Sequence, residues 1–153
     1  MSIACLPLLA QAAMPGCFLI NDRGGVLSYI EKISNVQLPE HINVISEFDN
    51  VEFVAGGKYR IDKKDLPVFL HSYPFEPLGR QHYRPFFNSY AGKDSIPISQ
   101  SAQLKYFSGC KPGNTWLFII NENTGELWIE IHYPDFSGQT PPCDKTDGNT
   151  KLH

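Results

Sequence analysis

Positive charge is sparse in this chain, and it is scattered. The 153 residues include 13 Lys and Arg against 16 Asp and Glu, which gives a formal net charge of −3. No more than two Lys or Arg are adjacent in the sequence. A nucleic-acid-binding surface needs a patch of positive charge to neutralise phosphates. We therefore expect no nucleic-acid partner.

Short motifs with a known chemistry are absent as well. The sequence holds no Gly-x-Ser-x-Gly, no phosphate-binding P-loop, no Gly-x-Gly-x-x-Gly and no His-Glu-x-x-His. Its four cysteines form no Cys-x-x-Cys pair, which excludes zinc-ribbon and thioredoxin-like sites. We predict no catalytic residue, no metal site and no cofactor.

The chain also lacks an apolar run that could span a membrane, for which a helix needs about 18 residues. Residues 3–13 form a shorter run that only Gln11 interrupts, and this length is typical of the apolar core of a secretory signal. The Ala-Gln-Ala triplet at 10–12 fits a cleavage site. We predict an export signal at residues 1–16 and a periplasmic or secreted protein. The alternative is a cytoplasmic protein in which residues 3–20 form a buried strand or helix.

The cysteines agree with export. Cys17 follows Gly16 in a Met-Pro-Gly-Cys sequence that resembles the lipid-attachment motif of bacterial lipoproteins. We predict that Cys5 leaves with the signal, that Cys17 carries a lipid anchor, and that Cys110 and Cys143 form a disulfide bond. Closing a loop of that length stabilises a fold by roughly 3.5–4 kcal/mol in the chain-entropy model.

Helical patterns appear at two places. Apolar side chains from Val26 to Ile33 recur at helical spacing, and we expect this helix to end at Leu38-Pro39. The alternative for this region is a hairpin around residues 22–25.

The second helix is predicted to begin after Asp65 as the N-cap residue, with Pro67 in its first turn. Its apolar face runs from Leu66 to Tyr73, and Pro74 ends it.

Strand patterns fill much of the remainder. A two-residue turn is predicted at Gly56-Gly57, and a chain break at residues 109–113. Short strands are predicted at residues 42–46, 51–55, 58–61 and 104–107.

The clearest pattern is a hairpin of residues 116–120 and 127–132, with Gly125 in the left-handed conformation of its turn. Alternating apolar residues fix the register, and a slip by one residue would place Glu130 in the core. Glu126 and Glu130 are expected to face solvent. The predicted pairs are Ile120 with Leu127, Phe118 with Ile129, and Trp116 with Ile131.

Together these elements predict an α+β fold: an antiparallel sheet of about five strands with two helices packed on one face. The domain is expected to cover residues 17–143, followed by a flexible tail at residues 144–153.

Two groups of polar residues are candidates for a catalytic or metal-binding site. Cys110 with His132 is the best candidate for a thiol nucleophile and its base, although a structural or disulfide-bonded cysteine is the favoured interpretation. Glu130, His132 and Asp135 are the best candidates for metal ligands. A turn in which the Asp135 side chain caps backbone N–H groups is favoured over a metal site.

The segment from Tyr73 to Tyr90 is rich in rings and arginines, which are the residues that anchor protein–protein interfaces. A satellite core of these rings under a long loop is the favoured interpretation, ahead of a protein interface, and a ligand groove is a further alternative. The predicted partner-binding residues are Arg80, His82, Tyr83, Arg84 and Phe87.

Two classes of function follow. The first is a non-enzymatic binding protein outside the cytoplasm, such as an immunity or inhibitor protein that blocks a toxin or enzyme, with a protein partner and membrane contact only through the lipid. The second is a small thiol-dependent hydrolase using Cys110. A structural component of the cell envelope is a further alternative.

Overall fold

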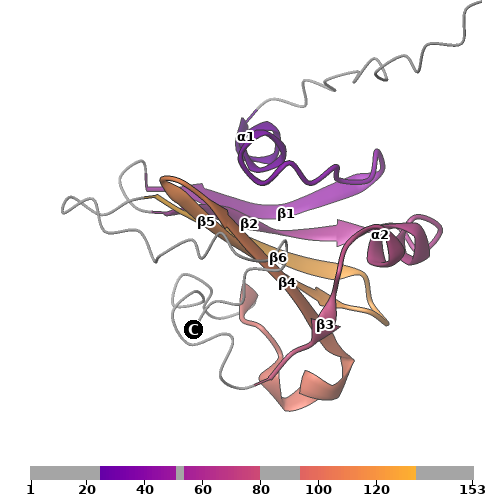
Figure 1. The fold of residues 1–153 in the computed structure, drawn as a ribbon. Coiled ribbons are helices and arrows are strands. Elements are labelled where there is room, and N and C mark those ends of the chain that lie inside the picture. Colours follow the sequence, from indigo (N-terminus) through magenta and orange to yellow (C-terminus); the bar gives the residue numbers. More distant parts are fainter. Residues whose placement is uncertain (1–24, 51–53, 80–93, 134–153) are drawn as a thin grey trace, which may run out of the picture.

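The chain folds as an α+β domain with two α-helices and a six-stranded sheet. The structure is a computed structural model, and it describes residues 25–50, 54–79 and 94–133. The helices are α1 (Gly25–Ser34), α2 (Leu66–Ser72) and the 3₁₀ helix η2 (Ile98–Gln103). The strands are β1 (Ile42–Asp49), β2 (Val54–Ile61), β3 (Glu76–Pro77), β4 (Leu104–Lys111), β5 (Asn114–Asn121) and β6 (Glu126–His132). Figure 1 shows their arrangement.

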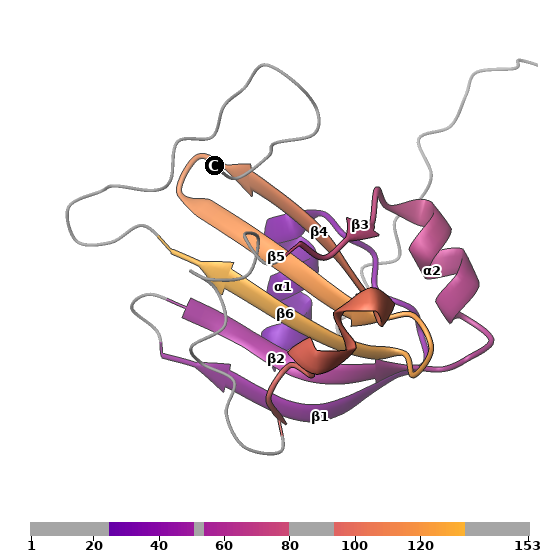
Figure 2. The same ribbon diagram turned by 90° about the horizontal axis from the view of Figure 1, so that it is seen from below.

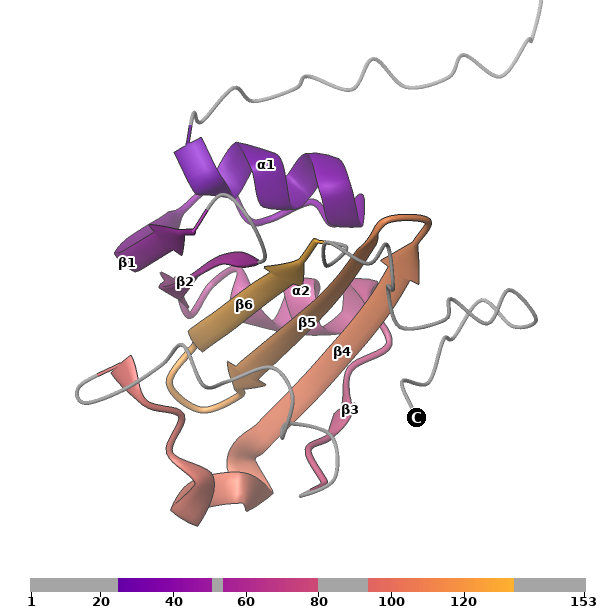
Figure 3. The ribbon, with the colours of Figure 1, turned by 90° about the vertical axis from the view of Figure 1, so that its left-hand side faces the viewer.

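The sheet is antiparallel throughout, in the order β1-β2-β6-β5-β4-β3 (Figure 3). The predicted fold class is confirmed, with six strands where about five were expected. The additional strand is β3, in which Glu76 and Pro77 pair with Tyr106 and Lys105 of β4. A two-residue strand has no alternation that a sequence pattern could reveal.

The predicted hairpin of β5 and β6 is confirmed in its register. Ile120 lies opposite Leu127, and the two further predicted pairs are present. Gly125 has φ of +73°, and a Cβ at this position would lie 2.5 Å from the carbonyl oxygen of Ile61. Glycine is therefore required here both for the left-handed backbone and for the close approach of β2.

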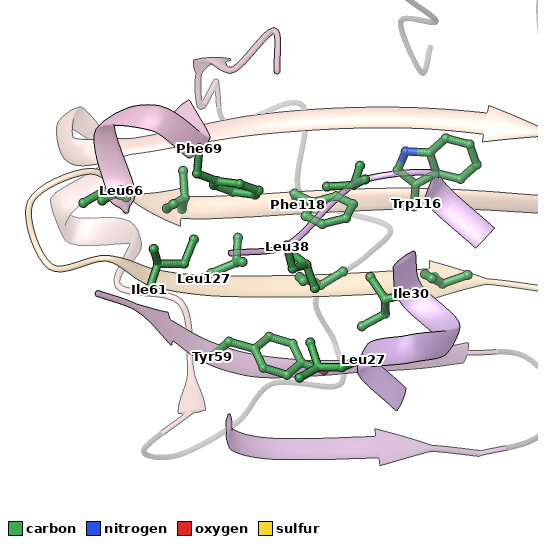
Figure 4. Packing of buried hydrophobic residues seen from close by; sticks show 14 residues of the cluster. Leu27, Ile30, Leu38, Tyr59, Ile61, Leu66, Phe69, Trp116, Phe118 and Leu127 are labelled. Atoms are coloured by element: carbon green, nitrogen blue, oxygen red, sulfur yellow. The ribbon is translucent and has the colours of Figure 1, made fainter. Parts of the chain in front are cut away.

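The main core lies between the sheet and both α-helices, which cover the same face (Figure 4). Leu27 and Ile30 of α1 and Leu66 and Phe69 of α2 pack on side chains from β2, β5 and β6. The predicted placement of two helices on one face is confirmed. The buried residues of this cluster are Leu27, Ile30, Val36, Leu38, Tyr59, Ile61, Leu66, Phe69, Trp116, Phe118, Ile120, Leu127, Ile129 and Ile131.

A second apolar cluster covers part of the opposite face. The chain that includes η2 lies there, on the side away from α1 (Figure 2). The indole Nε1 of Trp128 donates a hydrogen bond to the Asp94 carbonyl oxygen at 2.9 Å, which fastens this segment to β6. The buried residues of the cluster are Leu78, Ile96, Leu104, Tyr106, Leu117, Ile119 and Trp128.

The predicted turn at Gly56-Gly57 is wrong, because both glycines lie inside β2. A Cβ at Gly57 would lie 2.5 Å from the Tyr59 hydroxyl and 2.6 Å from the carbonyl oxygen of Ser46. Gly57 therefore lets the Tyr59 ring and the neighbouring strand approach the backbone of β2 closely. From the sequence the Gly-Gly pair was interpreted as a turn, whereas glycine is required at position 57 because of this close approach.

The helix boundaries were predicted less well at their ends than at their centres. Helix α1 ends at Ser34, and Asn35 follows with a left-handed φ of +58°, before the predicted stop at Leu38-Pro39. Helix α2 agrees with its prediction, since it ends at Ser72 and Tyr73 is extended. Asp65 occupies the N-cap position without a capping side-chain hydrogen bond. Its Oδ2 lies 3.6 Å from His41 Nδ1 instead.

Strand β4 does not break where the sequence predicted. It continues through Gly109 and Cys110 to Lys111, and the turn is confined to Pro112-Gly113, where Gly113 has φ of +89°. A Cβ at Gly109 would lie 2.6 Å from Trp116 Nε1. This glycine makes room for the Trp116 ring within the sheet and does not mark a loop.

We expect Gly57→Ala to destabilise the fold by about 1–3 kcal/mol, because the added methyl group overpacks against backbone that cannot move aside. The measurement is the free energy of unfolding from urea titration. The control is Val68→Ala on the exposed side of α2, which should stay within about 0.5 kcal/mol of the wild type. An equal stability of Gly57→Ala and wild type would contradict the close packing at β2.

Candidate functional site

The five predicted partner-binding residues, Arg80, His82, Tyr83, Arg84 and Phe87, lie outside the described residues. Their role stays a prediction. Two rings at the start of the same aromatic segment are described, and both pack into the core. The Tyr73 ring stacks on Phe107 with centroids 5.7 Å apart, and the Phe75 ring lies 5.6 Å from Phe69. Both rings thus pack against the main core, and not in a separate cluster under a long loop.

Cys110 lies on β4 and is half-buried. It sits opposite Thr115 of β5, which in turn sits opposite His132 of β6. The thiol and the imidazole thus belong to one row across the sheet, with a strand between them. Neighbouring strands are about 4.8 Å apart, so the backbones of Cys110 and His132 are separated by about 10 Å. The predicted bridge to Cys143 and the lipid on Cys17 involve residues outside the described ranges, and both stay predictions.

Glu130 is buried, with only 1% of its surface exposed, although the sequence predicted a solvent-facing residue. The reason is its position on β6, a central strand, where it lies between Gly56 of β2 and Leu117 of β5. His132 Nε2 lies 3.8 Å from Glu130 Oε1. A carboxylate in such a place requires polar partners, because an isolated buried charge is strongly unfavourable.

The Glu126 side chain is also less exposed than predicted, at 20%. Its Oε1 lies 3.3 Å from Lys58 Nζ and 3.5 Å from Arg60 Nη2. Lys58 is itself buried, and its ammonium group lies 5.3 Å from the centre of the Trp128 ring. This cluster therefore holds β2 against β6 through ion pairing and a cation–π contact.

The metal candidates are only partly described. Within residues 25–50, 54–79 and 94–133, no three His, Cys, Asp or Glu side chains are close enough to hold a metal ion. Asp135, the third ligand considered from the sequence, lies outside these ranges. The predicted absence of a metal stays a prediction.

None of the described helices has the length and apolar character that crossing a membrane would require.

Two tyrosines bind elements of the fold together. Burial raises the pKa of Tyr73 above its usual value, the charge of Glu31 adds to the rise, and a hydrogen bond with the Gln37 backbone opposes it. Burial also raises the pKa of Tyr106, and the charge of Glu76 and a hydrogen bond with it add to the rise. The Tyr106 hydroxyl donates this hydrogen bond to Glu76 Oε2 at 3.3 Å. Both hydroxyls stay neutral donors and acceptors near pH 7.

Strand β1 is the exposed edge of the sheet. Of the described residues, three large apolar side chains are exposed, and two of them are adjacent on β1: Val44 at 52% and Ile45 at 41%. The third is Val68 on α2. The pairing with β2 shifts between Val44 and Ser46, which makes Ile45 the extra residue of a β-bulge. Consecutive exposed apolar residues on an edge strand are unusual, since natural edges are commonly protected by charge.

The acidic and basic residues of the segment that contains this apolar pair are all acidic, apart from His41. Residues 40–50 contain Glu40, Glu47 and Asp49 but no Lys or Arg. Glu47 is held in place, since the Tyr59 hydroxyl donates a hydrogen bond to its Oε1 at 3.0 Å. Its Oε2 faces the first residue of α1, at 3.9 Å from where a Cβ of Gly25 would lie. A carboxylate is favoured there by the dipole of the helix.

Asp49 lies at the far end of β1, beside an aromatic pair. The rings of Tyr29 and Tyr133 are 5.7 Å apart. The pKa of Tyr133 is raised above its usual value, first by burial, then by its hydrogen bond with Tyr29 and by the charge of Asp49. The Tyr133 hydroxyl therefore remains neutral near pH 7.

We take β1 as the candidate functional site. The sequence carried one signal for it, the adjacent apolar pair Val44-Ile45, and this signal was not recognised. Comparison with protein-family models, with curated proteins and with solved structures found no match for this chain. The function proposed below therefore rests on the sequence and structure of this chain alone.

Proposed function

We propose that this protein is a non-enzymatic binding protein that acts outside the cytoplasm, of the immunity or inhibitor type that blocks a toxin or an enzyme. One observation supports the binding role: the exposed apolar pair Val44 and Ile45 on an edge strand of eight residues. In the described part of the chain no strand pairs with the outer side of β1, and an extended segment of another protein can bind to such an edge through its backbone, with selectivity from the side chains beside it.

The location is proposed from the sequence, through the export signal at residues 1–16 and the lipid anchor on Cys17. Export also accounts for a Cys110–Cys143 disulfide bond, since such bonds persist in oxidising compartments. The lipid would keep the protein at the membrane surface, where a toxin or enzyme that enters or leaves the cell must pass.

Photo-crosslinking in the native host tests the binding role. A photoreactive phenylalanine analogue replaces Ile45 in one variant and Phe87, a predicted partner-binding residue, in a second. We expect a discrete adduct with a different protein from at least one of these positions, because both are proposed to touch the partner. The matched control carries the analogue at Val68, which is 69% exposed, against 41% for Ile45, but lies on α2.

Three results bear on this proposal. An adduct from position 45 or 87 but not from 68 supports it, and the purified protein should then inhibit the activity of the adduct's partner. Identical adducts from all three positions indicate random collision and contradict it. The absence of any adduct from positions 45 and 87 contradicts it as well.

A thiol-dependent hydrolase is the second candidate, and the shared row of Cys110 and His132 across the sheet favours it. Intact-mass measurement of the natively exported protein, alkylated without a reducing agent, separates the two. We expect Cys110 to resist alkylation until reduction, because it is bridged to Cys143. Rapid alkylation of Cys110 near neutral pH, where only an activated thiol is ionised, would instead support the hydrolase.

A further inference from the structure

We draw no further inference here: the strongest candidate, the apolar pair Val44 and Ile45 on the edge strand β1, belongs to the site already described, and nothing in the structure shows which segment covers it.

Discussion

Strands β5 and β6 are buried on both of their faces, and the other elements depend on how these two strands pair. Toward the helices they present Phe118, Ile120, Leu127 and Ile129, and away from them Leu117, Ile119 and Trp128. Such strands can be stable only if helices cover one face and another layer covers the other. The register of this hairpin therefore fixes where α1, α2 and the segment around η2 must lie.

The same constraint decides where function can be placed. In the centre of the sheet, polar groups such as Glu130 and Lys58 are buried and serve contacts between strands. Side chains are more exposed on β1, which is the edge strand on one side of the sheet. Exposure, backbone donors and acceptors, and a one-signed charge occur together there. Such a combination suits recognition of another chain, whereas the Glu130 carboxylate is buried inside the sheet and cannot contact a partner.

The sequence predicted those features that follow from local periodicity. Alternation in residues 116–132 set the correct hairpin register, and the apolar spacing from Val26 to Ile33 located α1. The errors arose where the requirement for a residue comes from contacts with another part of the chain, which its own segment does not show. Gly57 is required by Tyr59 and Ser46 and is not in a turn, and Gly109 is required by Trp116. Glu130 is buried because β6 became a central strand, which no local pattern shows.

The candidate site was predictable only in part. Arg80, His82, Tyr83, Arg84 and Phe87 remain a prediction, whereas β1 emerged from the order of strands in the sheet. Whether a strand is central or at an edge depends on long-range pairing between residues 42–61 and 126–132, so exposure of Val44 and Ile45 could not be read from their own segment.

Native-state hydrogen exchange of the isolated protein tests most directly whether β1 is an open edge. Amides of residues 42–47 that face β2 should exchange slowly, while those that face outward should exchange at rates close to those of an unfolded chain. The amides of β5, which has partners on both sides, should all be protected. Uniform protection of residues 42–47 at the level of β5 would show that the edge is already covered and would contradict this account.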